Sequence, residues 1–303
     1  MTSKRTILPA LAVAIGTGFI MASAVAQQGA SATWQPVEEA LGVSGAVQPG
    51  DVYKVSLPRT DLNVSADGVA VKPALALGSW LAFKRADGGT TVMGDLVLTE
   101  DEVNPVLSVL EERGIEVTAL HHHLSNLSPN VLFMHVHGRG DAAELAEALR
   151  AGLERSATPL QASSSDEGPT QELGLDTAEL DRIIGYQGKA SGGVYHFSIP
   201  RAGEVTGDGM AVPPAMGTAT ALNFQPTGDG KAAITGDFVM TAEEVDPVIR
   251  ALREHGIGVT ALHNHMLSEE PRLFFMHFWA NDDAAKLAQG LRTALDQMNV
   301  ARG

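Results

Sequence analysis

The chain contains no cysteine among its 303 residues. This absence excludes disulfides, thiolate nucleophiles and thiolate metal ligands, and also a lipid anchor on an N-terminal cysteine. Any transition-metal site must therefore use histidine and carboxylate side chains. Aromatic residues are also scarce, at 5% of the chain, and most of them are needed for the core.

Positive charge is in short supply as well. The 21 lysines and arginines face 36 aspartates and glutamates, which gives a formal net charge of -15 at pH 7. Binding to nucleic acid depends on lysines and arginines that neutralise phosphates, so we expect no nucleic-acid partner. The sequence also lacks a glycine-rich phosphate loop and the nucleophile elbow of serine hydrolases.

The first 26 residues are typical of a secretory signal peptide. Lys4 and Arg5 precede a mostly apolar run over residues 7–25, and residues 24–26 form a small-x-small cleavage pattern. The run is interrupted and marginal in length for a bilayer span. We therefore expect cleavage before Gln27, no stable membrane span afterwards, and a periplasmic or secreted protein.

The remaining chain contains a duplication. The matching pairs of segments are residues 93–107 with 235–249, 114–123 with 256–265, and 131–135 with 273–277. We infer two homologous repeats, residues 37–154 and 178–298. Residues 155–177 between them are rich in Ser, Gln, Gly and Pro, a composition that predicts a flexible linker.

The hydrophobic period within each repeat changes from 2 to 3.6 and back. Thr99 and Glu102 predict the capping box of a helix, residues 115–124 and 131–137 predict a hairpin, and Asp141 predicts the cap of a final helix. This order favours an α+β fold, in which each repeat is an antiparallel sheet with two helices packed on one face. The strands predicted before the first helix are residues 52–57, 69–71, 75–83 and 90–98.

Eight of the ten histidines lie in the two predicted hairpins. Residues two apart on a strand face the same way, so His263 and His265 can direct their imidazoles to one point. If His277 lies opposite His265, three imidazoles converge on a divalent transition metal, with zinc first and copper, nickel or iron as alternatives. The predicted ligands of both hairpins are His121, His123, His135, His137, His263, His265 and His277.

The same register makes the two hairpins differ. It places His137 opposite His121 in the first hairpin, but Trp279 opposite His263 in the second. Only the first hairpin would then offer a fourth nitrogen. His122 has the opposite strand parity, so we leave it out of the predicted site.

Two repeated pairs of charged residues lie near these hairpins. Asp95 and Asp237 each follow a glycine. Each could be a metal ligand, orient an imidazole, act as the catalytic base for a water molecule on the metal, or be only a turn carboxylate. Arg59 and Arg201 each follow a proline, and each could hold an anionic ligand or be the solvated end of a strand.

The combination of these motifs resembles the bacterial LppY/LpqO family, a domain-of-unknown-function group (DUF1259). The motifs that carry the resemblance are Pro58-Arg59, Asp67-Gly68, Gly94-Asp95, Ala119 to His123, Phe133 to His135, Ala261 to His265 and Pro271 to Trp279. The resemblance implies two tandem copies of that domain, and it implies export because the named members are mycobacterial lipoproteins. It implies no activity. The chain departs from those members in lacking a cysteine for lipidation.

Three hypotheses follow. In the first, an exported protein binds a metal on each histidine hairpin and, as an enzyme, is a metal-dependent hydrolase with Asp95 or Asp237 as base. In the second, it is a non-catalytic periplasmic module that binds a peptide, glycan, lipid or other small molecule, and the histidines are polar lining. In the third, the repeats form an intramolecular pseudo-dimer with the histidines at the shared interface.

Overall fold

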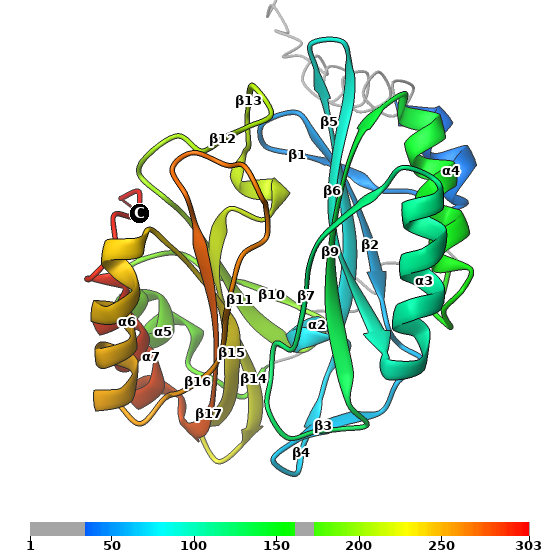
Figure 1. The fold of residues 1–303 in the computed structure, drawn as a ribbon. Coiled ribbons are helices and arrows are strands. Elements are labelled where there is room, and N and C mark those ends of the chain that lie inside the picture. Colours follow the sequence, from blue (N-terminus) through cyan, green and yellow to red (C-terminus); the bar gives the residue numbers. More distant parts are fainter. Residues whose placement is uncertain (1–33, 161–172, 303) are drawn as a thin grey trace, which may run out of the picture.

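The computed structural model describes residues 34–160 and 173–302. The predicted signal peptide and the middle of the predicted linker lie outside these residues. The chain forms two halves of matching architecture that lie side by side (Figure 1). No helix in the described part of the chain is long and apolar enough to cross a bilayer.

The first half begins with a helix at residues 34–41 and contains a six-stranded antiparallel sheet of order β1-β2-β5-β6-β9-β7. Its strands are β1 (Ala46–Gln48), β2 (Val52–Pro58), β3 (Val64–Ala66), β4 (Val69–Val71), β5 (Gly78–Ala86), β6 (Gly89–Thr99), β7 (Glu116–His121), β8 (Leu127–Ser128) and β9 (Val131–Gly140). Its other helices are α2 (Pro73–Ala76), α3 (Glu100–Glu112) and α4 (Ala142–Leu153).

The second half repeats this plan with a sheet of order β10-β11-β14-β15-β17-β16. Its strands are β10 (Lys189–Ser191), β11 (Val194–Pro200), β12 (Thr206–Gly207), β13 (Met210–Ala211), β14 (Ala219–Gly228), β15 (Lys231–Met240), β16 (Gly258–His263) and β17 (Phe274–Asp283). Its helices are α5 (Thr177–Ile184), the 3-10 turn η1 (Pro214–Met216), α6 (Ala242–Glu254) and α7 (Ala284–Leu295).

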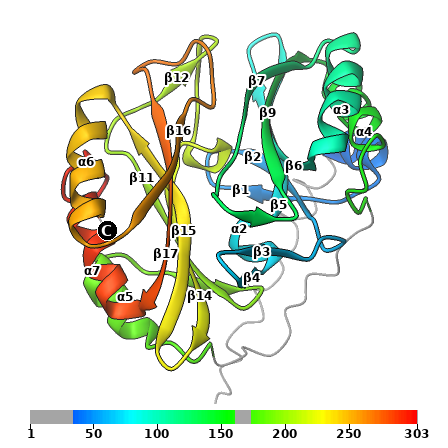
Figure 2. The same ribbon diagram turned by 60° about the horizontal axis from the view of Figure 1, so that its bottom comes forward.

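Helices cover the outer face of each sheet, and the inner faces point toward each other (Figure 2). Along β6, Leu96 belongs to the core beneath α3 and α4, whereas Met93 and Val97 belong to apolar clusters that both halves share. This alternation follows from the period of two in a strand. The predicted α+β fold of two tandem repeats is confirmed.

Each half sends a small β flap onto the inner face of the other sheet. We call β3-β4 flap 1 and β12-β13 flap 2. Flap 1 turns at Asp67-Gly68 and flap 2 at Asp208-Gly209, and all four residues have positive φ, as a tight hairpin turn requires. Flap 1 packs on Val194, Ala233 and Trp279, and flap 2 packs on Val52, Ala82 and Met93.

The repeated arginines join the sheets to the helices. Thr99 and Glu102 form the predicted capping box of α3. Arg59 is fully buried and donates to both Glu102 carboxylate oxygens and to the Val97 carbonyl, and Arg201 makes the matching bonds in the second half. Neither arginine is therefore the solvated end of a strand, and each holds a glutamate of its own half rather than an external anion.

Candidate metal centre between the two halves

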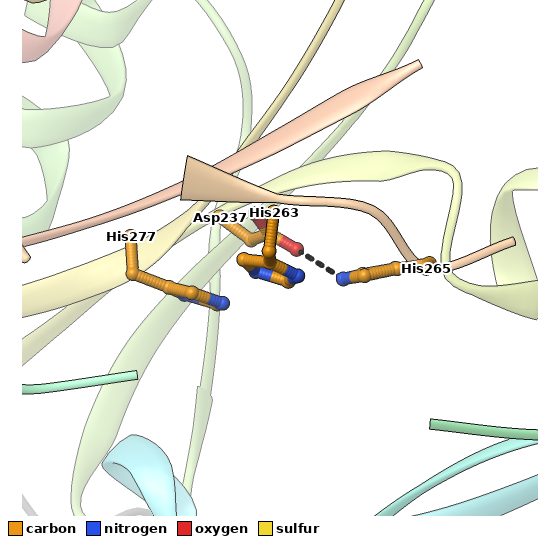
Figure 3. Close-up of side chains that lie close together, drawn as sticks. All are labelled: Asp237, His263, His265 and His277. Carbon is orange, nitrogen blue, oxygen red and sulfur yellow. Dashed lines mark ion pairs between the residues drawn. The ribbon is translucent and has the colours of Figure 1, made fainter. Parts of the chain in front are cut away.

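Strands β15, β17 and β16 and the chain just beyond β16 bring four side chains to the inner face of the second half. His277 on β17 pairs with Asp237 on β15 and with Ala261 on β16. His263 ends β16, and His265 lies two residues beyond it. Asp237, His263, His265 and His277 each offer a ligand atom, and these atoms lie within 4.8 Å of one another (Figure 3).

The first half repeats the arrangement. His135 on β9 pairs with Asp95 on β6 and with Ala119 on β7. The ligand atoms of His121, His123 and His135 also lie within 4.8 Å of one another. Asp95 adjoins them, since its Oδ2 lies 3.5 Å from His123 Nε2 and 3.9 Å from His135 Nε2.

The register predicted for the hairpins is wrong. His277 lies opposite Ala261 rather than His265, and His263 lies opposite Phe275 rather than Trp279. The ladder is irregular between Val259 and Ala261, and β16 ends at His263, so the chain beyond it carries His265 back toward the sheet. The three histidines still converge because an even displacement keeps a residue on the same face.

His137 is the predicted ligand that the structure does not bring to its group. It pairs with Glu116 across the ladder rather than with His121. Its Nδ1 lies 3.2 Å from a Glu116 carboxylate oxygen, and its Nε2 lies 2.8 Å from a carboxylate oxygen of Asp208 in flap 2. Both nitrogens therefore face carboxylates, away from the other histidines.

The two histidine groups stack against each other. The ring centroids are 3.5 Å apart for His121 and His263, 3.7 Å for His123 and His277, and 3.8 Å for His135 and His265. These three stacks, each with one ring from either half, combine six imidazoles into one buried group. We call it the histidine cluster, and it consists of His121, His123, His135, His263, His265 and His277.

Reciprocal hydrogen bonds hold the loops that carry the outermost histidines. Thr118 Oγ1 donates to the His265 carbonyl at 2.6 Å, and Thr260 Oγ1 donates to the His123 carbonyl at 2.5 Å. Each bond crosses from one half to the other. The geometry of each ligand group therefore depends on the opposite half.

Backbone carbonyls determine which ring nitrogen carries the proton. The Nδ1 atoms of His121, His263 and His277 lie 3.2, 3.0 and 2.7 Å from carbonyl oxygens. A carbonyl only accepts, so each Nδ1 must be the donor, and Nε2 keeps its lone pair. In the described structure, the Nε2 atoms of all six clustered histidines are buried without a hydrogen-bond partner.

The aspartates face these lone pairs. His265 Nε2 lies 3.2 Å from Asp237 Oδ2, the contact drawn dashed in Figure 3. An imidazole lone pair and a carboxylate oxygen this close together can both coordinate one cation. The Oδ1 atoms of Asp95 and Asp237 are also buried, with no hydrogen-bond partner in residues 34–160 and 173–302.

Burial dominates the electrostatics of the cluster. It lowers the pKa of His121 and of His263 to about 4 and the pKa of His277 to about 3. These imidazoles are neutral at pH 7, which is the state that binds metal. Burial and the nearby charge of Asp237 raise the pKa of Asp95 to about 8, and the Lys54 ammonium opposes this rise. A bound cation would favour the ionised carboxylates.

The repeated Gly-Asp motif has a steric cause. A Cβ on Gly236 would lie 1.9 Å from the carbonyl oxygen of Ala221. The glycine lets β14 and β15 approach closely, next to Asp237, and its own carbonyl accepts from His277 Nδ1. The motif was visible in the sequence, but the role of its glycine in orienting His277 was not predicted.

The two halves differ beside their aspartates. In the first half, Trp80 pairs with Asp95 across the ladder. Lys54 Nζ lies 4.2 Å from the centroid of the Trp80 ring and donates to the Ala215 carbonyl at 3.2 Å. In the second half, Ala221 stands in the place of Trp80. Sequence reasoning did not include Lys54, whose only signal was a charged residue within an apolar strand.

Comparison with known proteins identifies the repeated unit. A family described as Domain of Unknown Function (DUF1259) matches residues 35–155 and again residues 178–297. No curated protein matches the chain.

Among solved structures, a trimeric bacterial microcompartment shell protein, PduB, is 12% identical, with a TM-score of 0.22 over 85% of this chain and 95% of its own. EtuB from Clostridium kluyveri is 9% identical, with a TM-score of 0.20 over 82% and 87%. Scores this low carry no argument about fold or function.

Proposed function

We propose that this protein, which belongs to the DUF1259 family and contains two tandem copies of its domain, binds a divalent transition metal on the histidine cluster. The family assigns no activity, so the proposal rests on the geometry of the site. One observation carries the proposal: six buried Nε2 atoms converge without a hydrogen-bond partner among the described residues. Leaving so many buried polar atoms unpaired is costly, and a metal would satisfy them together.

We assign one ion to each half. His121, His123 and His135 with Asp95 would hold the first ion, and the second would be held by His263, His265 and His277 with Asp237. Three imidazoles and one carboxylate suit zinc, with copper, nickel or iron as alternatives, and the chain has no thiolate to compete.

We further propose that the cluster serves a metal-dependent hydrolase in the periplasm or outside the cell. A divalent ion in such a donor set supplies a Lewis acid. Asp95 and Asp237 support this extension, because each lies beside the donor nitrogens with one buried carboxylate oxygen left over. Such an oxygen can accept a proton from a reacting water. The signal-like N-terminus supports export.

Elemental analysis by plasma mass spectrometry tests the proposal. The mature protein would be purified without a histidine tag or chelator, beside the variant His263→Ala/His265→Ala and a matched control, His196→Ala. His196 lies outside the cluster and bonds to Asn223. We expect up to two equivalents of one transition metal, fewer in the double variant, and no change in the control.

Absence of metal would contradict the proposal if it persisted after reconstitution with zinc, copper, nickel and iron. That outcome would favour the non-catalytic binding module. Far-ultraviolet circular dichroism on the same samples shows whether each variant is folded.

A further inference from the structure

A pocket lies between the sheet of the first half and flap 2. Its lining includes Thr91, Met93 and His137 from the sheet, and Asp208, Met210 and Met266 from the second half. None of these residues belongs to the histidine cluster. The pocket is therefore a separate feature that the metal proposal does not use.

The pocket adjoins the histidine cluster on two walls. On the sheet, the pair Met93–His137 is the next same-face pair after Asp95–His135, and residues two apart on a strand are about 7 Å apart. On the opposite wall, Met266 directly follows His265. A molecule in the pocket would lie next to the proposed metal ligands.

The equivalent place in the other half is filled. Trp279 stands where His137 stands and is 91% buried, since only 9% of it is exposed. It packs with Val71 and Leu124 around flap 1 and with Ala233, the counterpart of Thr91. The imidazole of His137 is smaller than the indole of Trp279, so a pocket remains beside His137 where the other half is filled.

Thr91 supplies an unpaired polar group in the wall of the pocket. It is 3% exposed, and its hydroxyl is buried without a hydrogen-bond partner among the described residues. Leaving a buried hydroxyl without a hydrogen bond is costly. Because Thr91 lines the pocket, a rotation about χ1 would turn its hydroxyl toward a ligand there, and one polar atom of that ligand would satisfy it.

The charges and sulfurs of the lining narrow the class of ligand. The carboxylates of Glu116 and Asp208 lie against His137, and the chain carries a net charge of -15, so an anion would be repelled. Met93, Met210 and Met266 present polarisable thioethers, which pack well on aromatic rings.

We propose that this pocket binds a small uncharged aromatic molecule with one hydroxyl group, held by Thr91 beside the histidine cluster. As a pocket next to a metal, the proposal rests on the function proposed above. The binding of the aromatic molecule depends only on the residues that line the pocket. The pocket proposal and the metal proposal can therefore be tested separately.

Titration of the full mature chain with benzyl alcohol, followed by NMR, tests the pocket. Benzoate serves as the anionic comparison, and each titration is run on metal-free and zinc-loaded protein. We expect benzyl alcohol to bind saturably to both forms and to perturb methyl signals of Met93 or Met266. Benzoate should bind at least about tenfold more weakly, because of the acidic rim.

Two variants separate shape from hydrogen bonding. His137→Trp copies the residue of the filled side and should abolish binding. Thr91→Val keeps the shape but removes the hydroxyl, and it should weaken binding about tenfold. Neither residue is in the cluster, so the metal content of both variants should equal that of the wild type.

Several outcomes would overturn the pocket proposal: no binding of benzyl alcohol to the wild type, equal binding of benzoate, or unchanged binding in either variant. Benzyl alcohol binding without any metal content would instead overturn the proposed metal function and leave the pocket standing.

Discussion

The two sides of the histidine cluster have the same ligands but different surroundings. On one side, Trp279 closes the space beside His277, and Ala221 leaves Asp237 without an aromatic neighbour across the ladder. On the other, His137 leaves a pocket open beside His135. The duplication has therefore kept the histidines and changed their surroundings, so the histidine cluster is more open on the side of the first half.

The largest expected effect separates the two ions. His121→Ala/His123→Ala and His263→Ala/His265→Ala should each remove about one of two metal equivalents, because each half supplies its own donors. Plasma mass spectrometry of both variants measures this directly. If either variant loses all metal, the two halves share a single ion and the assignment of one ion to each half is wrong.

Glycine substitutions compare the two Gly-Asp motifs. Gly236→Ala should cost about 3 kcal/mol of stability, because its Cβ would lie 1.9 Å from a backbone oxygen. Gly94→Ala should cost less, about 2 kcal/mol, since its Cβ would lie 2.7 Å from the side-chain end of Leu81 and 2.8 Å from the carbonyl oxygen of Trp80. Urea unfolding of the metal-free variants gives both free energies. Equal losses would show that the two strand approaches are equally tight.

Acid should destabilise the metal-free protein. The unfolded chain protonates His121 and His263 near pH 6.5, whereas the folded chain does so only near pH 4. Between these values the unfolded state holds more protons, so stability falls as the pH falls. The raised pKa values of Asp95 and Asp237 have the opposite effect, but six clustered histidines outnumber two aspartates.

Urea midpoints between pH 7.5 and 5 measure this dependence. We expect a net loss of at least about 1.4 kcal/mol per pH unit below pH 6.5. The variant His121→Asn/His263→Asn should give a shallower slope, since it removes one titrating ring from each half. A flat profile for the wild type would contradict the buried, neutral state of the cluster.

The smallest expected effect concerns Lys54. Its ammonium lies close enough to oppose the raised pKa of Asp95, so it also repels a cation bound there. Lys54→Met should strengthen metal binding by the first half a few-fold and leave the second half unchanged. Competition with a chelator, using the double histidine variants to isolate each half, measures both affinities. A weaker first site would contradict this sign.

The fold and the grouping of the histidines within each hairpin could be predicted from the sequence, because both depend on local patterns. Strand periodicity, capping boxes and the repeat identify the α+β units, and same-face spacing places His263 with His265. The register could not be predicted, because it depends on the irregularity near Val259 and on where β16 ends. His137 was predicted as a metal ligand because of the same register error. The predicted register places it opposite His121, whereas it pairs with Glu116, and an error of an even number of residues leaves it on the same face of the sheet.

The stacking of the two halves was beyond any local pattern. It depends on flap 1 and flap 2 packing across the interface, and their apolar residues match any small hairpin when read in sequence. The interface hypothesis could be stated but not preferred. The pocket could not be predicted from the sequence either, because its two walls come from opposite halves.

The order of the ring stacks has a consequence for ancestry. His121 stacks on His263, which occupies the equivalent position in the other half. His123 stacks on His277, and His135 stacks on His265. These two contacts are equivalent, because His265 is the counterpart of His123 and His277 is the counterpart of His135. Self-pairing at one position and reciprocal pairing at two others is the signature of an isologous, two-fold interface. A relative with a single copy could therefore build the same cluster by homodimerising. Fusion of two such copies into one polypeptide would free each subunit to evolve its own flank, one closed by an indole and one left open.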